Sequence, residues 1–261
     1  MGTRKEWQRR LTVLGPMFAD AEQALGAALP RRFPDPDALT ALVHGRARTR
    51  GGQPVRFVSA NDGRTSALQY EQRVFETGLV ATRPEDWHDL FNALSWALFP
   101  QTKAALNAGH YRERDAAGRS RRRDALTLVD EAGLVCAVTE QTYEALNDRH
   151  DWRALFIERR AAWHRWIQPI LVGHGLMAQC LEPHIGLTAK AIYVPVPRDF
   201  AVLPARRRLA LVDGWLAERI ERLESPRELL PLPVLGIPEW HAANADPAFY
   251  DDTDYFRPRR R

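Results

Sequence analysis

Lysine and cysteine are scarce in this 261-residue chain, and the familiar catalytic motifs do not occur. Three of its 37 basic residues are lysines, which indicates a compositional bias and makes Lys103 and Lys190 of interest, although chance retention is the competing interpretation. The two cysteines, Cys136 and Cys180, lie in apolar contexts without metal-binding spacing, which predicts buried thiols in a reducing, cytoplasmic compartment. The absence of GxSxG, HExxH, GxGxxG and paired CxxC motifs excludes the enzyme classes that those signatures mark.

Long hydrophobic runs are also missing, and none approaches the ~20 residues that a membrane-spanning helix needs. The longest candidates, around 93–99 and 169–173, have the size of core segments, and the first residues lack the apolar stretch of a secretory signal. We therefore expect no membrane span. The apolar and charged fractions, 45% and 27%, are typical of soluble globular proteins.

Basic residues exceed acidic ones modestly, giving a formal net charge of +4 and a sequence isoelectric point of about 9.3. This balance permits an anionic ligand or nucleic acid as a partner without requiring either. The length allows one large domain or two small ones, and no internal repeat or low-complexity linker divides the chain. We predict a single domain over residues 1–261.

A helix predicted over residues 85–99 carries the first polar stripe. Thr82 followed by Glu85 fits a capping box, and His88, Asn92 and Ser95 recur at i, i+4 and i+7. The other faces are almost entirely apolar, which is typical of a buried helix. The stripe is therefore expected to face a polar contact or a pocket.

A second polar stripe follows the interruption at Pro100, on a helix predicted over residues 101–114. Lys103, Asn107 and His110 fall at i, i+4 and i+7 on one face. A polar stripe is more often a solvated face, and that interpretation is favoured for this helix. The alternative is that both stripes meet across one pocket.

The remaining patterns predict an α+β fold in which several helices pack on a small, mostly antiparallel sheet. A turn at 61–63 and a β-hairpin over 124–138 are expected, and residues 231–261, aromatic but without a period, are expected to form an extended strap over the core. Further helices are predicted at 16–29, 37–44, 139–148, 152–167, 171–181 and 204–223, and strands at 55–59, 68–77 and 189–196.

His174 is the third histidine of interest, since it lies between two glycines that permit close backbone approach. Packing at a helix crossing is the favoured interpretation, and delivery of a site histidine is the alternative. Asp130 and Glu131 lie at the tip of the predicted hairpin, where acidic residues are ordinary turn chemistry. Lys190 begins the strand at 189–196, whose prolines predict a sheet edge.

The string WHDLFNALSWALFPQTKAALNAGH at 87–110 resembles the signature of a mainly proteobacterial family known as domain of unknown function 3025. Three further stretches are similar to that family: RRRDALTLVDEAG at 121–133, VGHGLMAQCLEPHIGLTAKA at 172–191, and the ending LPVLGIPEW…FYDDTDYFRP. The resemblance implies that these segments form one unit. It implies no activity, cofactor or catalytic residue.

The first functional hypothesis is an enzyme, and specifically a hydrolase with a polar pocket on the helices at 85–114. A divalent metal such as Zn²⁺ or Mn²⁺ could activate water there, with ligands drawn from His88, His110, His174, Asp89 and Asp130. Without metal, a histidine could act as general base while Lys190 and Arg123 bind an anionic substrate. The catalytic candidates are His88, Asp89, Asn92, Lys103, Asn107, His110 and His174.

Two non-catalytic hypotheses stay open beside the enzyme. Arginine clusters at 46–50, 119–123, 206–208 and 257–261 suggest a nucleic-acid or anion-binding module, although no recognised nucleic-acid motif accompanies them. The third hypothesis is a domain that binds a small ligand or another protein without chemistry.

Overall fold

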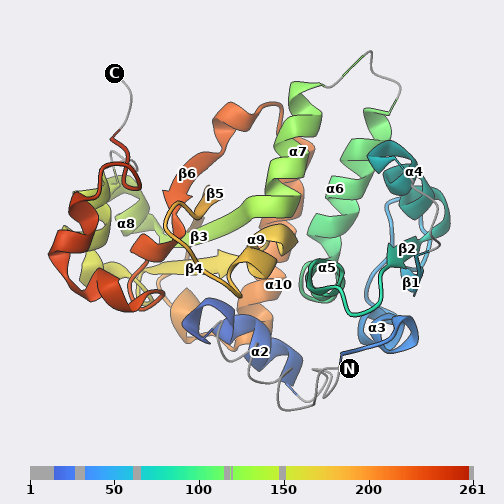
Figure 1. Cartoon of the computed structure of the whole chain (residues 1–261), viewed down its shortest axis with the longest axis horizontal. Coiled ribbons are helices and arrows are strands. Elements are labelled where there is room, and N and C mark those ends of the chain that lie inside the picture. The colour runs from blue at the N-terminus through green and yellow to red at the C-terminus, as the bar shows by residue number, and fades with distance from the viewer. Residues whose placement is uncertain are drawn as a thin grey trace.

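The structure is a computed structural model that describes residues 15–26, 33–60, 66–114, 118, 120–146 and 151–258. The turn predicted at 61–63 and the end of the helix predicted at 16–29 lie outside these residues. The predicted α+β class is confirmed, because long helices accompany two small sheets (Figure 1). The strands are β1 Arg56–Ser59, β2 Leu79–Thr82, β3 Gly133–Thr139, β4 Ile167–Leu171, β5 Thr188–Val196 and β6 Leu230–Pro233.

The larger sheet has more antiparallel than parallel strand pairs, as predicted, whereas the smaller sheet is parallel. The larger sheet has the order β4-β3-β5-β6, in which the central β3–β5 pair is parallel and both outer pairs are antiparallel. The smaller sheet is the parallel pair β1–β2. A parallel pair needs a crossover connection, and β4 with the short helix α9 (His174–Gln179) supplies it between β3 and β5. Every residue of β3 is buried, as expected for a strand covered on both faces.

The single proline of β5, Pro195, lies where the ladder is incomplete. Strand β6 pairs only with Thr188–Ala191, whereas Pro195 lies beyond it and faces Val138 of β3. The proline therefore occupies the part of β5 that β6 does not cover, which agrees with the edge position predicted for it.

The helices divide into a group near the small sheet and a group around the larger one (Figure 1). The other helices are α2 Ala19–Leu25, α3 Pro36–Val43, α4 Ala67–Thr77, α5 Trp87–Leu98, α6 Pro100–Arg112, α7 Arg121–Ala132, α8 Glu140–Ala145 and α10 Ala205–Glu221. Helix α7 leads directly into β3, and α9 packs against both α5 and α7. Helix α10 packs along α6, which packs in turn against α4.

Two segments predicted as strands are helices. In α4, Ser66 and Gln69 form a capping box, and Gly78 ends the helix with a left-handed φ of 72°. In α7, the Ser120 hydroxyl accepts a hydrogen bond from the backbone N–H of Arg123. The predicted hairpin is therefore wrong, and Glu131 lies in the last turn of a helix. Short apolar segments can match the two-residue period of a strand and the 3.6-residue period of a helix, and here helix caps and tertiary contacts decide in favour of the helix.

Two predicted helices are interrupted by irregular structure. Instead of one helix over 152–167, a π-helical turn at Ala154–Glu158 and a 3-10 turn at Arg160–Ala162 precede strand β4. The helix predicted over 171–181 is shorter than expected, because Leu171 ends strand β4 and helix α9 begins only at His174. Helix α5 begins at Trp87 with Asp86 as its N-cap, so the predicted Thr82 cap is wrong.

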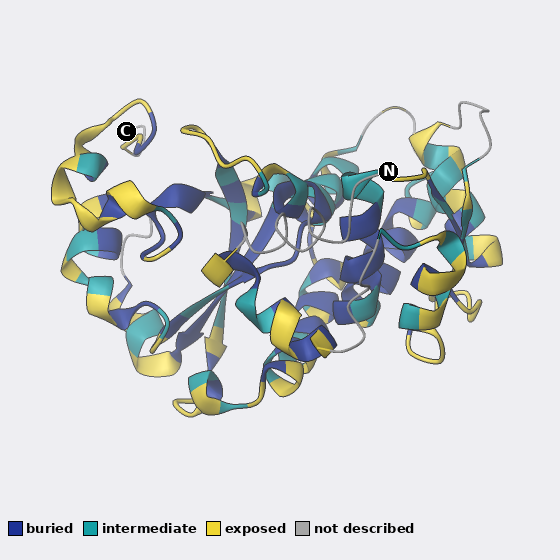
Figure 2. Cartoon of the chain, turned by 60° about the horizontal axis from the view of Figure 1, so that its bottom comes forward, coloured by how far each residue is buried: buried dark blue, intermediate teal, exposed yellow. Residues whose placement is uncertain are grey.

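The buried apolar residues form one connected cluster that includes side chains from Met17 to Phe256. Figure 2 shows the strands of the larger sheet mainly in the colours of buried and intermediate residues, with exposed residues on the outer turns. A single core supports the prediction of one domain, which stays a prediction. Among the described residues, none of the helices has the length and apolar character to cross a membrane.

The C-terminal segment follows the core as a series of short turns after β6. The Tyr255 hydroxyl donates to the Leu187 carbonyl (2.7 Å) and accepts from the Leu235 N–H (3.0 Å). The side-chain amide of Asn244 donates to the carbonyls of Leu235 and Ile237. These contacts agree with the predicted strap over the core, although its start is the regular strand β6.

Candidate functional site

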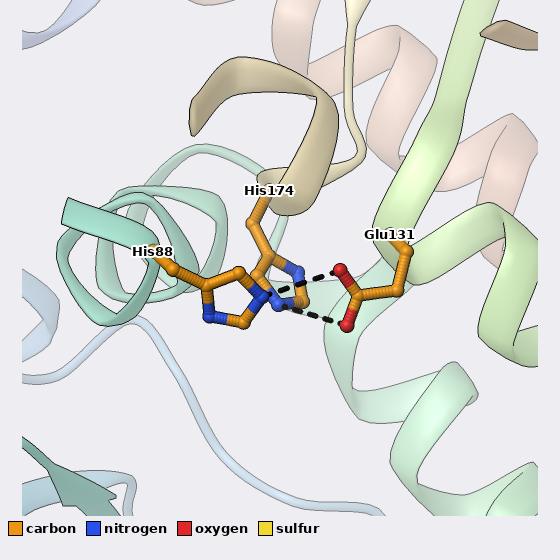
Figure 3. A group of neighbouring side chains, drawn as sticks. All are labelled: His88, Glu131 and His174. Atoms are coloured by element: carbon orange, nitrogen blue, oxygen red, sulfur yellow. Dashed lines mark hydrogen bonds and ion pairs between the residues drawn. The ribbon is translucent and has the colours of Figure 1, made fainter. Parts of the chain in front are cut away.

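Three side chains from three helices point toward one another (Figure 3). His88 comes from the first turn of α5, Glu131 from the last turn of α7, and His174 from the first position of α9. The His88 Nε2 lies 3.3 Å from Glu131 Oε2, and the His174 Nε2 lies 3.6 Å from Glu131 Oε1. Donor atoms of the three residues all lie within 4.8 Å of one another.

The two glycines beside His174 permit this approach. A Cβ on Gly175 would overlap the Glu131 carboxylate, and a Cβ on Gly173 would overlap the backbone where α7 joins β3. Close packing, the favoured interpretation of the Gly-His-Gly segment, is therefore what brings His174 to the cluster, and its role as a site histidine stays a prediction.

The second nitrogen of each imidazole lies beside another carboxylate. The His88 Nδ1 is 3.5 Å from Asp89 Oδ1, and the His174 Nδ1 is 3.5 Å from Asp130 Oδ1; these are ion-pair distances, and neither Nδ1 makes a hydrogen bond within the described part of the chain. A cation holds each carboxylate: the Arg83 guanidinium donates twice to Asp89 (2.7 and 2.9 Å), and the Lys103 Nζ lies 2.5 Å from Asp130. Two series of interacting side chains, Arg83–Asp89–His88 and Lys103–Asp130–His174, thus meet at Glu131.

These contacts shift the pKa values of His88, Asp89 and Asp130. Asp89 and then Glu131 raise the pKa of His88 to about 9 despite partial burial. Burial opposes ionisation of Asp130, but Lys103 and His174 outweigh it and hold the pKa of that carboxyl well below its usual range. Arg83 and His88 outweigh burial at Asp89 in the same way. The carboxylates are therefore ionised at neutral pH.

The cluster lines a cavity of about 1110 Å³. His174 is buried, whereas the side chains of His88 and Glu131 are 42% and 45% exposed, so a small molecule in the cavity can reach them. The cavity wall also includes residues of α4, α5, α6 and α7, among them Tyr70, Glu71, Arg73, Asn92, His110 and Arg123.

The second polar stripe is buried, so the favoured interpretation of a solvated face is wrong. Lys103, Asn107 and His110 are 6%, 3% and 8% exposed. The Asn107 side chain donates to the backbone carbonyl (2.9 Å) and carboxylate (2.7 Å) of Glu71, which lines the cavity. Burial and the nearby Asp130 raise the pKa of Glu71 to about 7. Helix α4, predicted as a strand, covers the stripe.

The structure brings together only some of the predicted ligands. His88 and His174 share the cluster with Glu131, whereas Asp89 and Asp130 lie behind the imidazoles. His110 lines the cavity outside the cluster, and burial lowers its pKa to about 4. Asp86, His88 and Asp89 form a second close group, but Arg83 pairs with both of its carboxylates.

The other predicted site residues have different positions. The side-chain amide of Asn92 donates to the Tyr70 hydroxyl (3.2 Å) at the cavity wall, and Arg123 lines the same wall from α7. Lys190 lies in β5 opposite Gly133 and is not among the residues that line the cavity. Glu131 was assigned to turn chemistry, and the helical spacing of Ala125, Leu126 and Val129 is the sequence signal that places it on a helix.

Several arginines of the predicted basic clusters have internal partners. Arg122 donates to the carbonyls of Ile220, Glu221 and Leu223 at the end of α10 and pairs with Glu224. Arg208 pairs with Asp20, and Arg206 donates to the carbonyl of Ala24. These side chains stabilise helix ends and helix contacts in the fold.

Residues 55–260 match the sequence family described as Protein of unknown function (DUF3025). The chain belongs to this family. The resemblance inferred from the strings at 87–110, 121–133 and 172–191 is thereby confirmed, since the match includes all of them. No curated protein and no solved structure matches the chain. The DUF3025 assignment covers the strands and helices that carry the cavity, and its description names no activity.

Proposed function

We propose that this DUF3025 protein is a metal-dependent hydrolase in which His88, Glu131 and His174 bind a divalent cation, Zn²⁺ or Mn²⁺. One observation carries the proposal: each imidazole has one nitrogen in the cluster and the other beside a carboxylate. Histidines that bind metal in proteins typically have this second carboxylate or carbonyl partner, which orients the ring and raises its basicity.

The donor spacing supports the same proposal. A tetrahedral site with bonds of about 2.0–2.1 Å to nitrogen and oxygen has donor atoms about 3.3 Å apart. The His88 Nε2 lies 3.3 Å from Oε2 of Glu131 and the His174 Nε2 lies 3.6 Å from Oε1, which is near that value, and one donor atom from each of the three residues lies within 4.8 Å of the others. Two histidines and one glutamate are a donor set of catalytic zinc sites, where the remaining position is open to water or substrate.

Each residue has a distinct role in this mechanism. A bound divalent ion would lower the pKa of a coordinated water and polarise a substrate carbonyl or phosphoryl oxygen. Arg83 with Asp89, and Lys103 with Asp130, would hold the two imidazoles in orientation. Glu71 lines the same cavity, and its pKa of about 7 suits a group that accepts a proton near neutral pH.

The test is elemental analysis for zinc, manganese and iron in protein purified without chelators. Iron is included because two histidines and a carboxylate also bind Fe²⁺ in proteins. We expect near-stoichiometric metal in the wild type and its loss in His88→Ala, His174→Ala and Glu131→Gln. His184→Ala is the matched control, because that exposed histidine lies outside the cluster.

Circular dichroism melting of each variant separates loss of metal from loss of fold. Metal retained in a folded His88→Ala/His174→Ala double variant would contradict the proposal. So would a wild type that contains no metal and binds neither Zn²⁺ nor Mn²⁺ on titration. Metal-loaded protein would then be screened against esters, amides and phosphate esters, with Glu131→Gln as the inactive control.

A further inference from the structure

The cavity extends along α7 well beyond the three clustered side chains. Arg123, Thr127, Asp130 and Glu131 all line it, and they recur at i, i+4, i+7 and i+8, which is one face of a helix. With a rise of 1.5 Å per residue, Arg123 lies about 12 Å along the helix from Glu131. The cavity therefore has two ends, one at the cluster and one at Arg123.

Arg123 carries a buried donor that lacks an acceptor. Its Nε is shielded from solvent and has no hydrogen-bond partner in the structure. An unpaired buried donor is unfavourable, and more so on a charged group. An acceptor supplied by a ligand in the cavity would satisfy it.

The other charges around the cavity are largely compensated by protein groups. Arg83 pairs with Asp86 and Asp89, and Lys103 pairs with Asp130. Glu131 faces the two imidazoles, so it is not available to Arg123. His110, which also lines the cavity, is neutral at pH 7, because burial lowers its pKa to about 4.

A second guanidinium reaches the same cavity from the opposite helix. Arg73 of α4 lines it, and among the residues that the structure describes its side chain has no ion pair or hydrogen bond. Glu71, the acid of α4 that lines the cavity, accepts from Asn107 and has a raised pKa of about 7. Among the described residues, neither Arg73 nor Arg123 has a carboxylate partner.

We propose that Arg123 binds the anionic group, a phosphate or carboxylate, of a small-molecule substrate whose reacting bond lies at the His88–Glu131–His174 cluster about two to three helical turns away. The guanidinium fork matches both anions in geometry. A cavity of about 1110 Å³ suits a small organic ligand. The position of the reacting bond rests on the proposed function, whereas anion binding at Arg123 does not.

The experiment is isothermal titration calorimetry of the purified full chain, as isolated and after loading with Zn²⁺, with inorganic phosphate and with succinate as probes. Arg123→Gln is expected to lower the affinity for the probe about 10- to 100-fold, because it removes a charge-assisted hydrogen bond. Arg123→Lys keeps the positive charge but lacks the paired N–H donors of the planar guanidinium group, and we expect an intermediate affinity. Arg121→Gln is the matched control, since that arginine is exposed on the same helix and does not line the cavity.

The two proposals fail in different ways. Probe binding that persists in the His88→Ala/His174→Ala variant but falls in Arg123→Gln supports the Arg123 site even if no metal binds. Binding that is unchanged in Arg123→Gln, or absent for both probes in the wild type, overturns it. Probe binding that is lost only in the double histidine variant would place the anion at the cluster and would also overturn the proposed site at Arg123. If Arg123→Gln does not fold, Arg123→Lys decides by the same criterion.

A single-stranded oligonucleotide serves as the last probe. Tighter binding of the oligonucleotide than of phosphate, with dependence on Arg123, would overturn the assignment to a small molecule and support a nucleic-acid ligand.

Discussion

Substituting Gly175 by alanine should abolish metal binding while leaving the fold intact. The added Cβ would overlap the Oε2 of Glu131 and would lie 3.0 Å from the backbone oxygen of that residue. Since ordinary contacts between heavy atoms are about 3.5–4.0 Å, the carboxylate would have to move by about 1 Å. The atom that must move furthest is the end of a flexible, partly exposed side chain, and the backbone oxygen has to give by only a few tenths of an ångström, so the cost to folding is small.

The same displacement is large for a metal site. Distances from donor atoms to a metal are defined within about 0.2 Å, so a shift of about 1 Å removes Glu131 as a ligand. We expect metal affinity to fall at least ~100-fold, which corresponds to about 2.7 kcal/mol. The change in the free energy of unfolding of the metal-free protein should stay below about 1 kcal/mol.

Two other glycine substitutions serve as controls. Gly173→Ala places its Cβ against backbone atoms, including the Ala132 nitrogen at 2.7 Å, and should destabilise the metal-free protein by about 1–3 kcal/mol or more. Gly214→Ala in α10 meets no atom within 4 Å and should be neutral or stabilising by up to about 1 kcal/mol.

The assays are competition of a chromophoric chelator for Zn²⁺ and urea denaturation after chelation. Wild-type zinc affinity in a folded Gly175→Ala variant would refute the role assigned to Glu131. Equal destabilisation by Gly175→Ala and Gly173→Ala would show that the segment matters for packing alone.

Three further perturbations test the buried polar network. Lys103→Met leaves the Asp130 carboxylate without its cation and should cost about 3–5 kcal/mol in urea denaturation, which a second change, Asp130→Asn, should partly restore. The pKa of Glu71 is about 7 in the folded protein and 4.5 in the unfolded chain, so its contribution to the free energy of unfolding should fall by about 2–3 kcal/mol as the pH rises from 4.5 to 7. Glu71→Gln should remove this pH dependence. Identical pH profiles of stability for the variant and the wild type would contradict the raised pKa. Asp213→Ala removes the acceptor for the N–H groups of Gln101 and Thr102 and should lower the melting temperature, reflecting a loss of about 1–3 kcal/mol; an unchanged melting temperature would show that water replaces the acceptor.

Long helices with strong local signals were predictable from the sequence. The apolar face between Trp87 and Leu98, the stop at Pro100 and the stripe of His88 and Asn92 all follow from a period of 3.6 residues. Their buried, pocket-facing position followed from the lack of a solvated face on α5. The same reasoning assigned α6 a solvated stripe, because nothing local shows that α4 covers it.

The segment at 121–133 shows where local reasoning fails. Its alternating residues suggested a strand, yet a Ser120 cap and the helical burial of Leu126 and Val129 make it α7. The error removed Glu131 from the candidate ligands, because an acidic side chain in a hairpin turn and one in the last turn of a helix point in different directions. The family resemblance, which depends on residue identity and not on period, was unaffected by this error and is confirmed.

The sequence by itself determined the α+β class, the DUF3025 family, and the two stripes that carry His88 and Lys103. The stripes depend on residues close in sequence, whose side chains interact over one or two helical turns, and the family depends on residue identity. Only the tertiary structure decided that His88, Glu131 and His174 meet, because they come from three helices and 86 residues separate the first from the last. Their meeting depends on the close approach at Gly175, and such long-range contacts are set by how the whole core packs and not by any local pattern.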